Sequence, residues 1–265
     1  MALTLHTRIY GQGNQGKPLV ILHGLYGSAI NWGSIANTLA KEGFMVYAMD
    51  LRNHGASPHH PSMTYVEMAA DVLQTMAEHG LTQASCLGHS MGGKTAMMLA
   101  LMAPSAIDRL IVADIAPVDY TRRSQNKAHR ALIAAMATLD LKPIRSRTEA
   151  DHALRPSITE HDLRAFLLSN LVHREGRFCW RINLDAIGKA LPDILDFKAP
   201  PGRAFAGPTL FLSGGQSDYV RQEDFDHARL LFPNAQWKVI ENARHWLHVD
   251  APEAVYRAIF SFLSS

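Results

Sequence analysis

The stretch Gly88-His89-Ser90-Met91-Gly92 constrains the fold of this chain more than any other. A short apolar run, residues 83–87, precedes it, and a run rich in small and apolar residues, 93–101, follows at once. This order predicts a strand, a sharp turn and a helix, with the serine hydroxyl exposed on the turn. The glycines leave room where a Cβ would crowd the backbone. The alternative is a glycine-rich turn that happens to carry a surface serine.

Length and composition define the broad class of the protein. The 265 residues can bury a full core, and 47% of them are hydrophobic. A formal charge of +2 gives no electrostatic reason to expect nucleic acid or a membrane surface as a partner. The two cysteines make no disulfide framework, and neither a signal peptide nor a membrane span is recognisable. We expect a cytoplasmic monomer or homodimer that acts on a small molecule.

The 14 histidines raise the question of a metal. No H-E-x-x-H pattern occurs, and the histidines are scattered along the chain. We therefore expect no metal and no cofactor.

Apolar runs alternate with helical patterns along most of the chain, which predicts an α/β fold with a mostly parallel central sheet flanked by helices. The runs typical of strands are residues 3–9, 18–22, 44–49, 83–87, 109–113, 208–212 and 236–240. Helical spacing or helix-boundary residues mark residues 31–40, 63–79, 93–101, 222–231 and 252–263.

The pattern changes between residues 118 and 205. Helical spacing dominates there, and only residues 178–182 resemble a short strand. We interpret the chain as a core of residues 1–117 and 206–265, with a helical cap of residues 118–205 inserted into it.

A serine hydroxyl needs a base within hydrogen-bond reach to act as a nucleophile. His245 is the candidate, because it follows the last core strand and so reaches the sheet edge where Ser90 lies. The backbone N–H groups of Leu25 and Met91 are the candidate donors to an oxyanion. Four other histidines are rivals for the base: His23, His54, His89 and His248.

Four segments together resemble the α/β-hydrolase superfamily: residues 23–25, 50–57, 88–93 and 242–246. The resemblance covers nearly the whole chain outside the cap. Residues 22–28, 114–117 and 214–217 further resemble the small YbfF-type bacterial carboxylesterases. This implies hydrolysis of esters or acyl thioesters beneath a mobile helical lid. Asn53 stands where a glycine is common in the superfamily, and asparagine tolerates left-handed backbone angles.

The acid that would orient His245 has two candidates. Many members of the superfamily carry this acid after the strand that corresponds to residues 208–212, three places before a valine. In this chain that place is Ser217, and Asp218 is one place late. Asp114 ends the strand beside the nucleophile strand, an alternative position that this fold uses. Either carboxylate could orient the imidazole and stabilise its charged form, and we favour Asp114.

These features predict a serine carboxylic-ester hydrolase that acts on short to medium acyl esters through an acyl-enzyme, with Ser90 as nucleophile. A serine argues against dehalogenase and epoxide-hydrolase chemistry, which needs a carboxylate nucleophile on this fold. One alternative is an acyl-CoA thioesterase with the same machinery. A basic cluster at the start of the cap could meet a phosphate, although a solvated helix face is the preferred interpretation: Arg122, Arg123 and Lys127. The other alternative is a ligand receptor without turnover.

Overall fold

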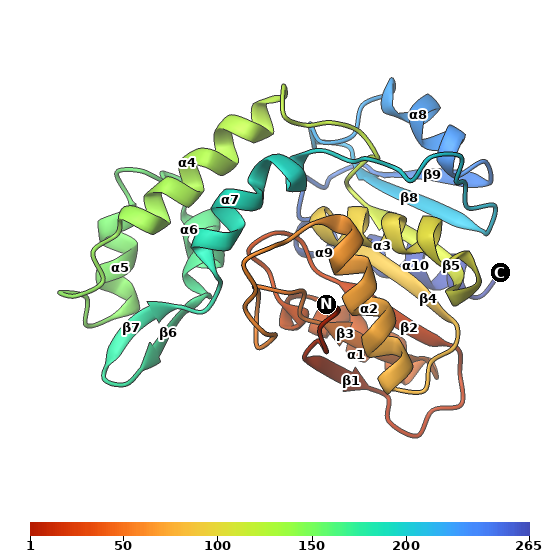
Figure 1. Ribbon diagram of the computed structural model, residues 1–265, viewed down its shortest axis with the longest axis horizontal. Coiled ribbons are helices and arrows are strands. Elements are labelled where there is room, and N and C mark those ends of the chain that lie inside the picture. The colour runs from red at the N-terminus through yellow and green to blue at the C-terminus, as the bar shows by residue number, and fades with distance from the viewer.

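A seven-stranded sheet lies at the centre of the computed structural model, which describes residues 1–265 (Figure 1). The strands lie in the order β1-β3-β2-β4-β5-β8-β9, and every neighbouring pair is parallel except β1 with β3. The predicted mostly parallel sheet is confirmed. The strands are β1 (Thr7–Tyr10), β2 (Pro18–Leu22), β3 (Met45–Met49), β4 (Ala84–His89), β5 (Ile107–Ala113), β8 (Thr209–Gly214) and β9 (Ala235–Ile240).

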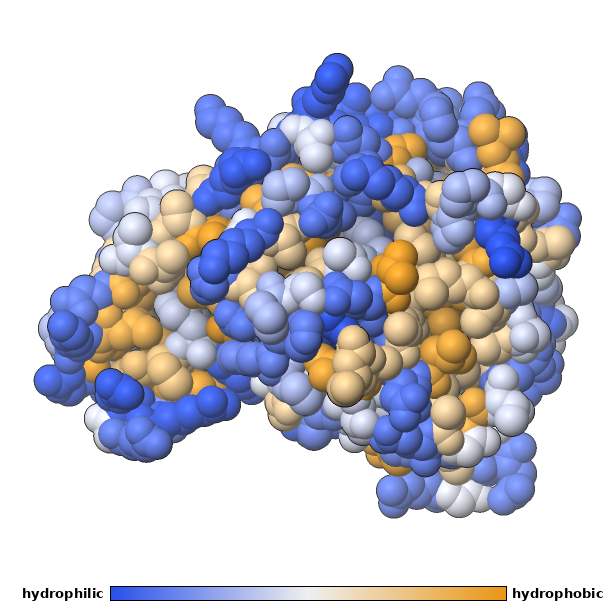
Figure 2. All heavy atoms as spheres, viewed as in Figure 1, coloured by the Kyte–Doolittle hydropathy of each residue, from blue (hydrophilic) through white to orange (hydrophobic).

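Helices cover both faces of the sheet, because side chains alternate along each buried strand. In β2, Val20 and Leu22 belong to the apolar cluster that includes α2, α3 and α8, whereas Leu19 and Ile21 belong to the cluster with α1 and α10. These helices are α1 (Gly33–Lys41), α2 (Tyr65–Glu78), α3 (Met91–Met102), α8 (Asp224–Leu231) and α10 (Pro252–Leu263). Shorter helical turns are η1 (Ala29–Trp32), η2 (Pro104–Ala106) and α9 (Leu247–Asp250). No helix has both the length and the apolar character needed to cross a membrane. On the face shown in Figure 2, hydrophilic residues are mixed with apolar ones.

The first helical region begins earlier than its sequence pattern predicts. Ser28, not Asn31, is the residue at the N-terminal boundary, and η1 precedes α1. The Oδ1 atom of Asn31 accepts a hydrogen bond from the Ser28 N–H at 2.7 Å. Asn31 is therefore inside η1, and its side chain accepts the hydrogen bond of the backbone N–H at the start of this helical turn.

The segment of residues 118–205 lies between β5 and β8 in the chain and beside the sheet in space, at the left of Figure 1. It is not wholly helical, because a hairpin of β6 and β7 stands among its helices. Only the second strand of this hairpin was predicted from the sequence, at residues 178–182. The elements are α4 (Ser124–Thr138), α5 (Arg147–Leu154), α6 (His161–Leu168), β6 (Leu171–Arg174), β7 (Arg177–Trp180) and α7 (Leu184–Leu195).

Lys94 of α3 forms hydrogen bonds with the backbone near both ends of this inserted segment. Its ammonium donates to the carbonyl oxygens of Val118, Leu195 and Asp196 at 3.0, 2.7 and 3.1 Å, and it lies 4.5 Å from the centre of the Tyr120 ring. Burial lowers the pKa of Lys94 to about 7, and the three carbonyls replace the water that the ammonium has lost. One buried side chain thus holds the chain where it enters the segment and where it leaves.

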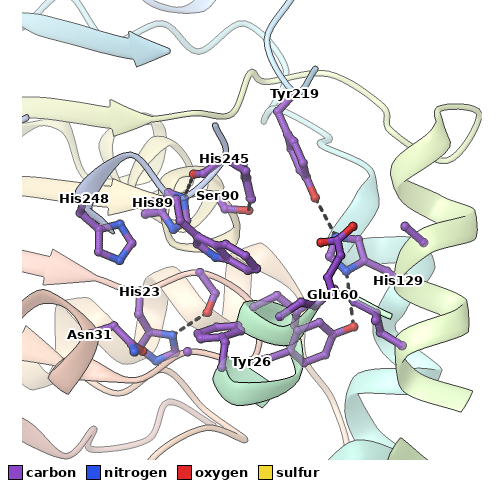
Figure 3. A pocket seen from close by; sticks show the side chains of 18 of the residues that line it. His23, Tyr26, Asn31, His89, Ser90, His129, Glu160, Tyr219, His245 and His248 are labelled. Atoms are coloured by element: carbon purple, nitrogen blue, oxygen red, sulfur yellow. Dashed lines mark hydrogen bonds between the residues drawn. The ribbon is translucent and has the colours of Figure 1, made fainter. Parts of the chain in front are cut away.

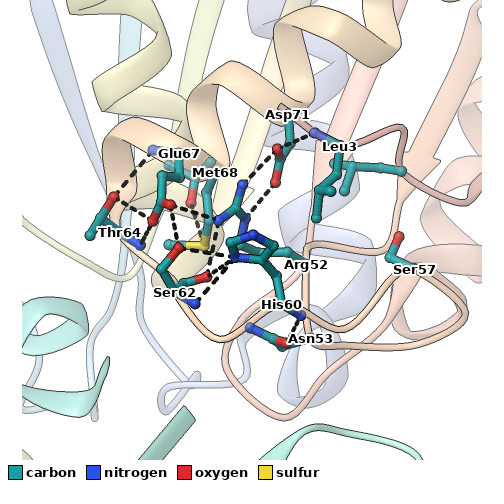
Figure 4. A network of polar contacts seen from close by, with 12 residues as sticks. Leu3, Arg52, Asn53, Ser57, His60, Ser62, Thr64, Glu67, Met68 and Asp71 are labelled. Carbon is teal, nitrogen blue, oxygen red and sulfur yellow. Dashed lines mark hydrogen bonds and ion pairs between the residues drawn. The ribbon is translucent and has the colours of Figure 1, made fainter. Parts of the chain in front are cut away.

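A buried ion pair ties the loop after β3 to α2 (Figure 4). Arg52 donates through Nε and Nη2 to the two carboxylate oxygens of Asp71 at 2.6 and 2.8 Å, and through Nη1 to the Ser62 carbonyl at 3.0 Å. Neither side chain of the pair is exposed. The next residue, Asn53, has a φ of 66°, so the expected left-handed conformation is confirmed.

Replacing Asp71 with alanine is expected to lower the free energy of unfolding by about 3 kcal/mol, because the buried Arg52 guanidinium would lose its two hydrogen bonds to a buried carboxylate and keep only one charged partner, Glu67, whose carboxylate lies 3.2 Å from Nη1. Urea denaturation of the two proteins measures the difference. The control is Asp185→Ala, which breaks the exposed pair with Lys189 and is expected to cost less than about 0.5 kcal/mol. Equal losses in the two variants would contradict this interpretation of the buried pair.

Candidate active site

Ser90 occupies the turn between β4 and α3 with φ 54° and ψ −119°, a conformation rare for residues other than glycine. Its N–H donates to the Ala113 carbonyl at 2.9 Å. The flanking glycines are required by close packing. A Cβ on Gly92 would lie 2.4 Å from the Leu22 carbonyl oxygen, and one on Gly88 would lie 2.1 Å from the Gly92 carbonyl oxygen. The predicted strand, turn and helix are therefore present, and the glycines are a steric necessity.

His245 and Asp114 form a hydrogen-bonded chain with Ser90. The Nε2 atom of His245 lies 3.1 Å from Ser90 Oγ, and Nδ1 lies 2.8 Å from Asp114 Oδ2. The Asp114 side chain is fully buried, whereas that of His245 is 21% exposed. The three residues follow β4, β5 and β9, whose carboxyl ends meet at one edge of the sheet. A hydroxyl, an imidazole and a carboxylate thus form the chain of contacts that nucleophilic catalysis by a serine requires.

The structure distinguishes between the two candidate acids. Asp114 accepts hydrogen bonds from the Gly214 N–H at 2.9 Å and from the Ser217 hydroxyl, in addition to the imidazole. Asp218 is exposed, and its carboxylate accepts instead from the Ser124 hydroxyl of α4 at 3.2 Å. Asp114 rather than Asp218 therefore contacts His245, and its role as the acid of the site stays a prediction. Ser217, at the place where the superfamily pattern predicts the acid, donates instead to the carboxylate of Asp114.

Two backbone N–H groups beside Ser90 are free to bind a ligand oxygen. The N–H of Leu25 makes no hydrogen bond within the protein. Met91 is the first residue of α3, so the helix leaves its N–H without a partner. The loop that carries Leu25 passes close to the serine, since a Cβ on Gly24 would lie 3.3 Å from Ser90 Cβ. The loop before Leu25 thus passes beside Ser90, and Met91 follows Ser90 in the chain; that their two N–H groups bind an oxyanion stays a prediction.

The rival histidines are engaged away from the serine hydroxyl. His23 accepts from the Leu51 N–H at 2.9 Å, and His54 accepts from the Tyr26 N–H at 3.2 Å. Nε2 of His89 lies 2.8 Å from the carbonyl oxygen of His245, and His248 stacks on Trp32. No three His, Cys, Asp or Glu side chains are arranged to hold a metal ion.

Ser90 and His245 line a cavity of about 350 Å³ between the core and the inserted segment (Figure 3). The inserted segment supplies mostly apolar side chains to its wall, and the loops of the core supply most of the polar ones. The apolar side chains from the segment are Ala128, Leu132, Leu163 and Phe166.

The sequence did not predict a role for Tyr26, His129 or Tyr219, which also line this cavity. The Tyr219 ring stacks on the His245 ring, with centroids 3.5 Å apart and planes 11° apart. His129 of α4 lies between the hydroxyls of Tyr219 and Tyr26 (Figure 3). Tyr26 directly follows Leu25, and Tyr219 directly follows Asp218, so both adjoin residues that were candidates for the site on the sequence alone. His129 lies in an amphipathic helix and carries no such signal.

The sheet, the serine turn and the hydrogen-bonded chain define the class of protein, and comparison with known proteins agrees. A family model described as the alpha/beta hydrolase fold matches residues 17–129. Esterase YbfF of Escherichia coli K12 is 35% identical over 264 residues, which cover 100% of each chain. The solved structure of a marine microorganism esterase has a TM-score of 0.95 at 41% identity, covering 98% of this chain and 100% of that one. This chain belongs to the α/β-hydrolase family.

Within the family, several of its relatives are named as esterases or lipases. The sn-1-specific diacylglycerol lipase ABHD11 of Mus musculus is 43% identical over 249 residues, which cover 93% of this chain and 80% of that protein. The resemblance to YbfF-type carboxylesterases is confirmed, and the protein is a hydrolase of the esterase and lipase group.

The buried histidines of this region predict a loss of stability in acid. Burial lowers the pKa of His54 to about 3 and of His129 and His248 to about 4, against about 6.5 in an unfolded chain. From pH 6.5 down to about 4 the unfolded state therefore binds protons that the folded state does not, so stability falls as the pH falls. Each group contributes up to roughly 1.4 kcal/mol per pH unit.

Urea denaturation at pH 7.5 and pH 5.0 measures this effect, and a decrease of several kcal/mol is expected. In His54→Gln the free energy of unfolding should fall less between the two pH values, because the variant lacks one histidine that takes up a proton only on unfolding. His161→Gln, at an exposed position, should leave it unchanged. A free energy of unfolding that is constant across this pH range would rule out the explanation.

Proposed function

We propose that this protein is a serine carboxylic-ester hydrolase that cleaves short to medium acyl esters through an acyl-enzyme intermediate. The observation that carries the proposal is the chain from Ser90 to His245 to Asp114, with contacts of 3.1 and 2.8 Å beside a cavity of about 350 Å³. The names of the relatives, esterase and diacylglycerol lipase, support the same class of reaction.

Acylation would begin when Ser90 Oγ attacks the ester carbonyl carbon while Nε2 of His245 takes the hydroxyl proton. Asp114 accepts the Nδ1 hydrogen bond, which fixes the tautomer of the ring and stabilises the imidazolium that forms. The N–H groups of Leu25 and Met91 donate to the oxygen of the tetrahedral intermediate as its negative charge develops.

The intermediate would collapse when the imidazolium of His245 gives its proton to the leaving alcohol. Water then occupies the place of the alcohol, and His245 removes a proton from it as it attacks the acyl carbon. A second tetrahedral intermediate releases the carboxylic acid and restores the hydroxyl of Ser90. Two further donors, the Gly214 N–H and the Ser217 hydroxyl, hold the Asp114 carboxylate in position.

The inserted segment would act as a cap over the substrate. Leu132 and Leu163 face the cavity from α4 and α6, so a bound ester would be enclosed between the segment and the core. The cavity volume is near the lower end of the roughly 300–1,000 Å³ that is usual for ligand pockets. A compact ester fits this space better than one with a long acyl chain.

The alternative of an acyl-CoA thioesterase receives less support. Arg123 is paired with the carboxylate of Asp224, with a contact of 3.0 Å through Nη1, so it is not available to a phosphate. Only Arg122 and Lys127 of that cluster remain exposed. A receptor without turnover would need no base aligned on the serine, which is why hydrolysis is preferred.

Ser90→Ala is expected to lower kcat/KM for p-nitrophenyl butyrate by about 10⁴-fold or more, because no other nucleophile reaches the acyl carbon. Release of p-nitrophenol measures the rate, and circular dichroism verifies that the variant is folded. Wild type should hydrolyse acetyl and butyryl esters faster than the palmitoyl ester. Activity of the variant within tenfold of wild type would place the nucleophile elsewhere, and rates rising steadily to palmitoyl would contradict the acyl range.

Asp114→Asn is expected to lower kcat by about 10³- to 10⁴-fold, because the amide no longer fixes the tautomer of His245 or stabilises its charge. Asp218→Asn is the matched control and is expected to cost tenfold at most, since its carboxylate contacts Ser124. Steady-state kinetics on the two folded proteins give the comparison. The reverse ranking would remove Asp114 from the proposed mechanism.

A further inference from the structure

Tyr26, His129 and Tyr219 form a short hydrogen-bonded chain on the wall of the cavity (Figure 3). Nε2 of His129 lies 3.1 Å from the Tyr219 hydroxyl, and Nδ1 lies 3.4 Å from the Tyr26 hydroxyl. Tyr26 comes from the loop after β2, His129 from α4 and Tyr219 from the loop after β8. Three segments far apart in the sequence therefore bring polar atoms together in a largely apolar space.

This chain has one hydrogen-bond donor more than it can use internally. Burial and the nearby charge of His245 lower the pKa of His129 to about 4, so its ring is neutral and carries one N–H and one lone pair. Burial raises the pKa of both phenols, which therefore stay protonated. One phenol donates to the bare ring nitrogen, and the other accepts from the N–H. Whichever tautomer forms, the accepting phenol keeps an unused O–H.

An unused O–H in such a cavity discriminates between ligands. A ligand that brings an oxygen to it gains a hydrogen bond, whereas an alkyl group that displaces water from it leaves a buried donor unpaired. The accepting phenol oxygen also has a second lone pair, so a ligand hydroxyl can both accept and donate there. The chain is thus suited to a hydroxyl group and poorly suited to a methylene.

The position of the chain indicates which part of an ester it meets. The ring of Tyr219 stacks on the ring of His245. In the proposed function His245 delivers its proton to the leaving alcohol, so the alcohol must lie next to this imidazole. The Tyr219 end of the chain therefore lies beside the residue that would protonate the leaving alcohol.

We propose that the chain of Tyr26, His129 and Tyr219 is a subsite for a second oxygen on the leaving alcohol. The preferred substrates are then esters of hydroxylated alcohols, such as monoesters of glycols and other polyols, over esters of simple alkyl alcohols of the same size. The inference rests on the proposed hydrolysis by Ser90, and it adds the class of alcohol.

The test compares two esters of the same acyl group and similar alcohol size, 2-hydroxyethyl butyrate and propyl butyrate. Titration of the released acid measures kcat/KM for each. Wild type is expected to favour the hydroxylated ester by about tenfold, the value of one hydrogen bond that the alkyl ester leaves unmade. In the variant Tyr26→Phe/His129→Leu/Tyr219→Phe, which keeps an aromatic ring beside His245, the ratio is expected to fall to about one.

The control variant is Tyr47→Phe, which removes a phenol on β3 outside the cavity and should leave the ratio unchanged. If the triple variant does not fold, Tyr26→Phe/Tyr219→Phe removes two of the three donors and should lower the ratio at least threefold. A wild-type ratio near one overturns the proposal, and so does a high ratio that survives in the variants. Failure of wild type to hydrolyse even p-nitrophenyl butyrate would instead reject the proposed function itself.

Discussion

The close contact between the first turn of α3 and the carboxyl end of β2 is the constraint on which the site depends. Gly92 lies against the carbonyl groups of Leu22 and His23, and Gly88 lies against Gly92, so that no Cβ fits at either glycine. This contact forces the chain to reverse within one residue, and Ser90 takes the unusual backbone angles that result. The hydroxyl is thereby held out from the sheet edge, between the Leu25 loop and the start of α3.

The same helix also determines where the inserted segment lies. Lys94 is four residues after the serine, and its ammonium binds carbonyls at both ends of the segment. An ammonium removed from water needs such partners, so any movement of these connections away from α3 would leave a buried charge unsolvated. The cavity wall formed by α4 is therefore positioned by the same helix that positions Ser90. In the proposed function, the nucleophile and the cap over the substrate would both depend on α3.

Much of the fold could be read from local patterns. Strong signals come from β2, β4 and α2. A buried strand appears in the sequence as a continuous apolar run, and an amphipathic helix appears as apolar residues at helical spacing. Of the β6–β7 hairpin, only β7 was predicted, because both strands are short and few of their residues are buried. Ser90 and His245 were also predictable from local patterns. Ser90 lies between glycines directly after a core strand, and His245 follows the last core strand.

The sequence by itself determined the alternation of strands and helices, the serine turn and the histidine at the end of the last strand, because each depends on residues close together in the chain. Only the tertiary structure showed that Asp114, and not Asp218, contacts His245. Both follow core strands, and the choice depends on the pairing of β5 with β8, which brings the Gly214 N–H and the Ser217 hydroxyl to Asp114. The contacts of His129 with two tyrosines, 103 and 90 residues away, likewise exist only once α4 packs over the core, since no local pattern encodes a meeting of distant side chains.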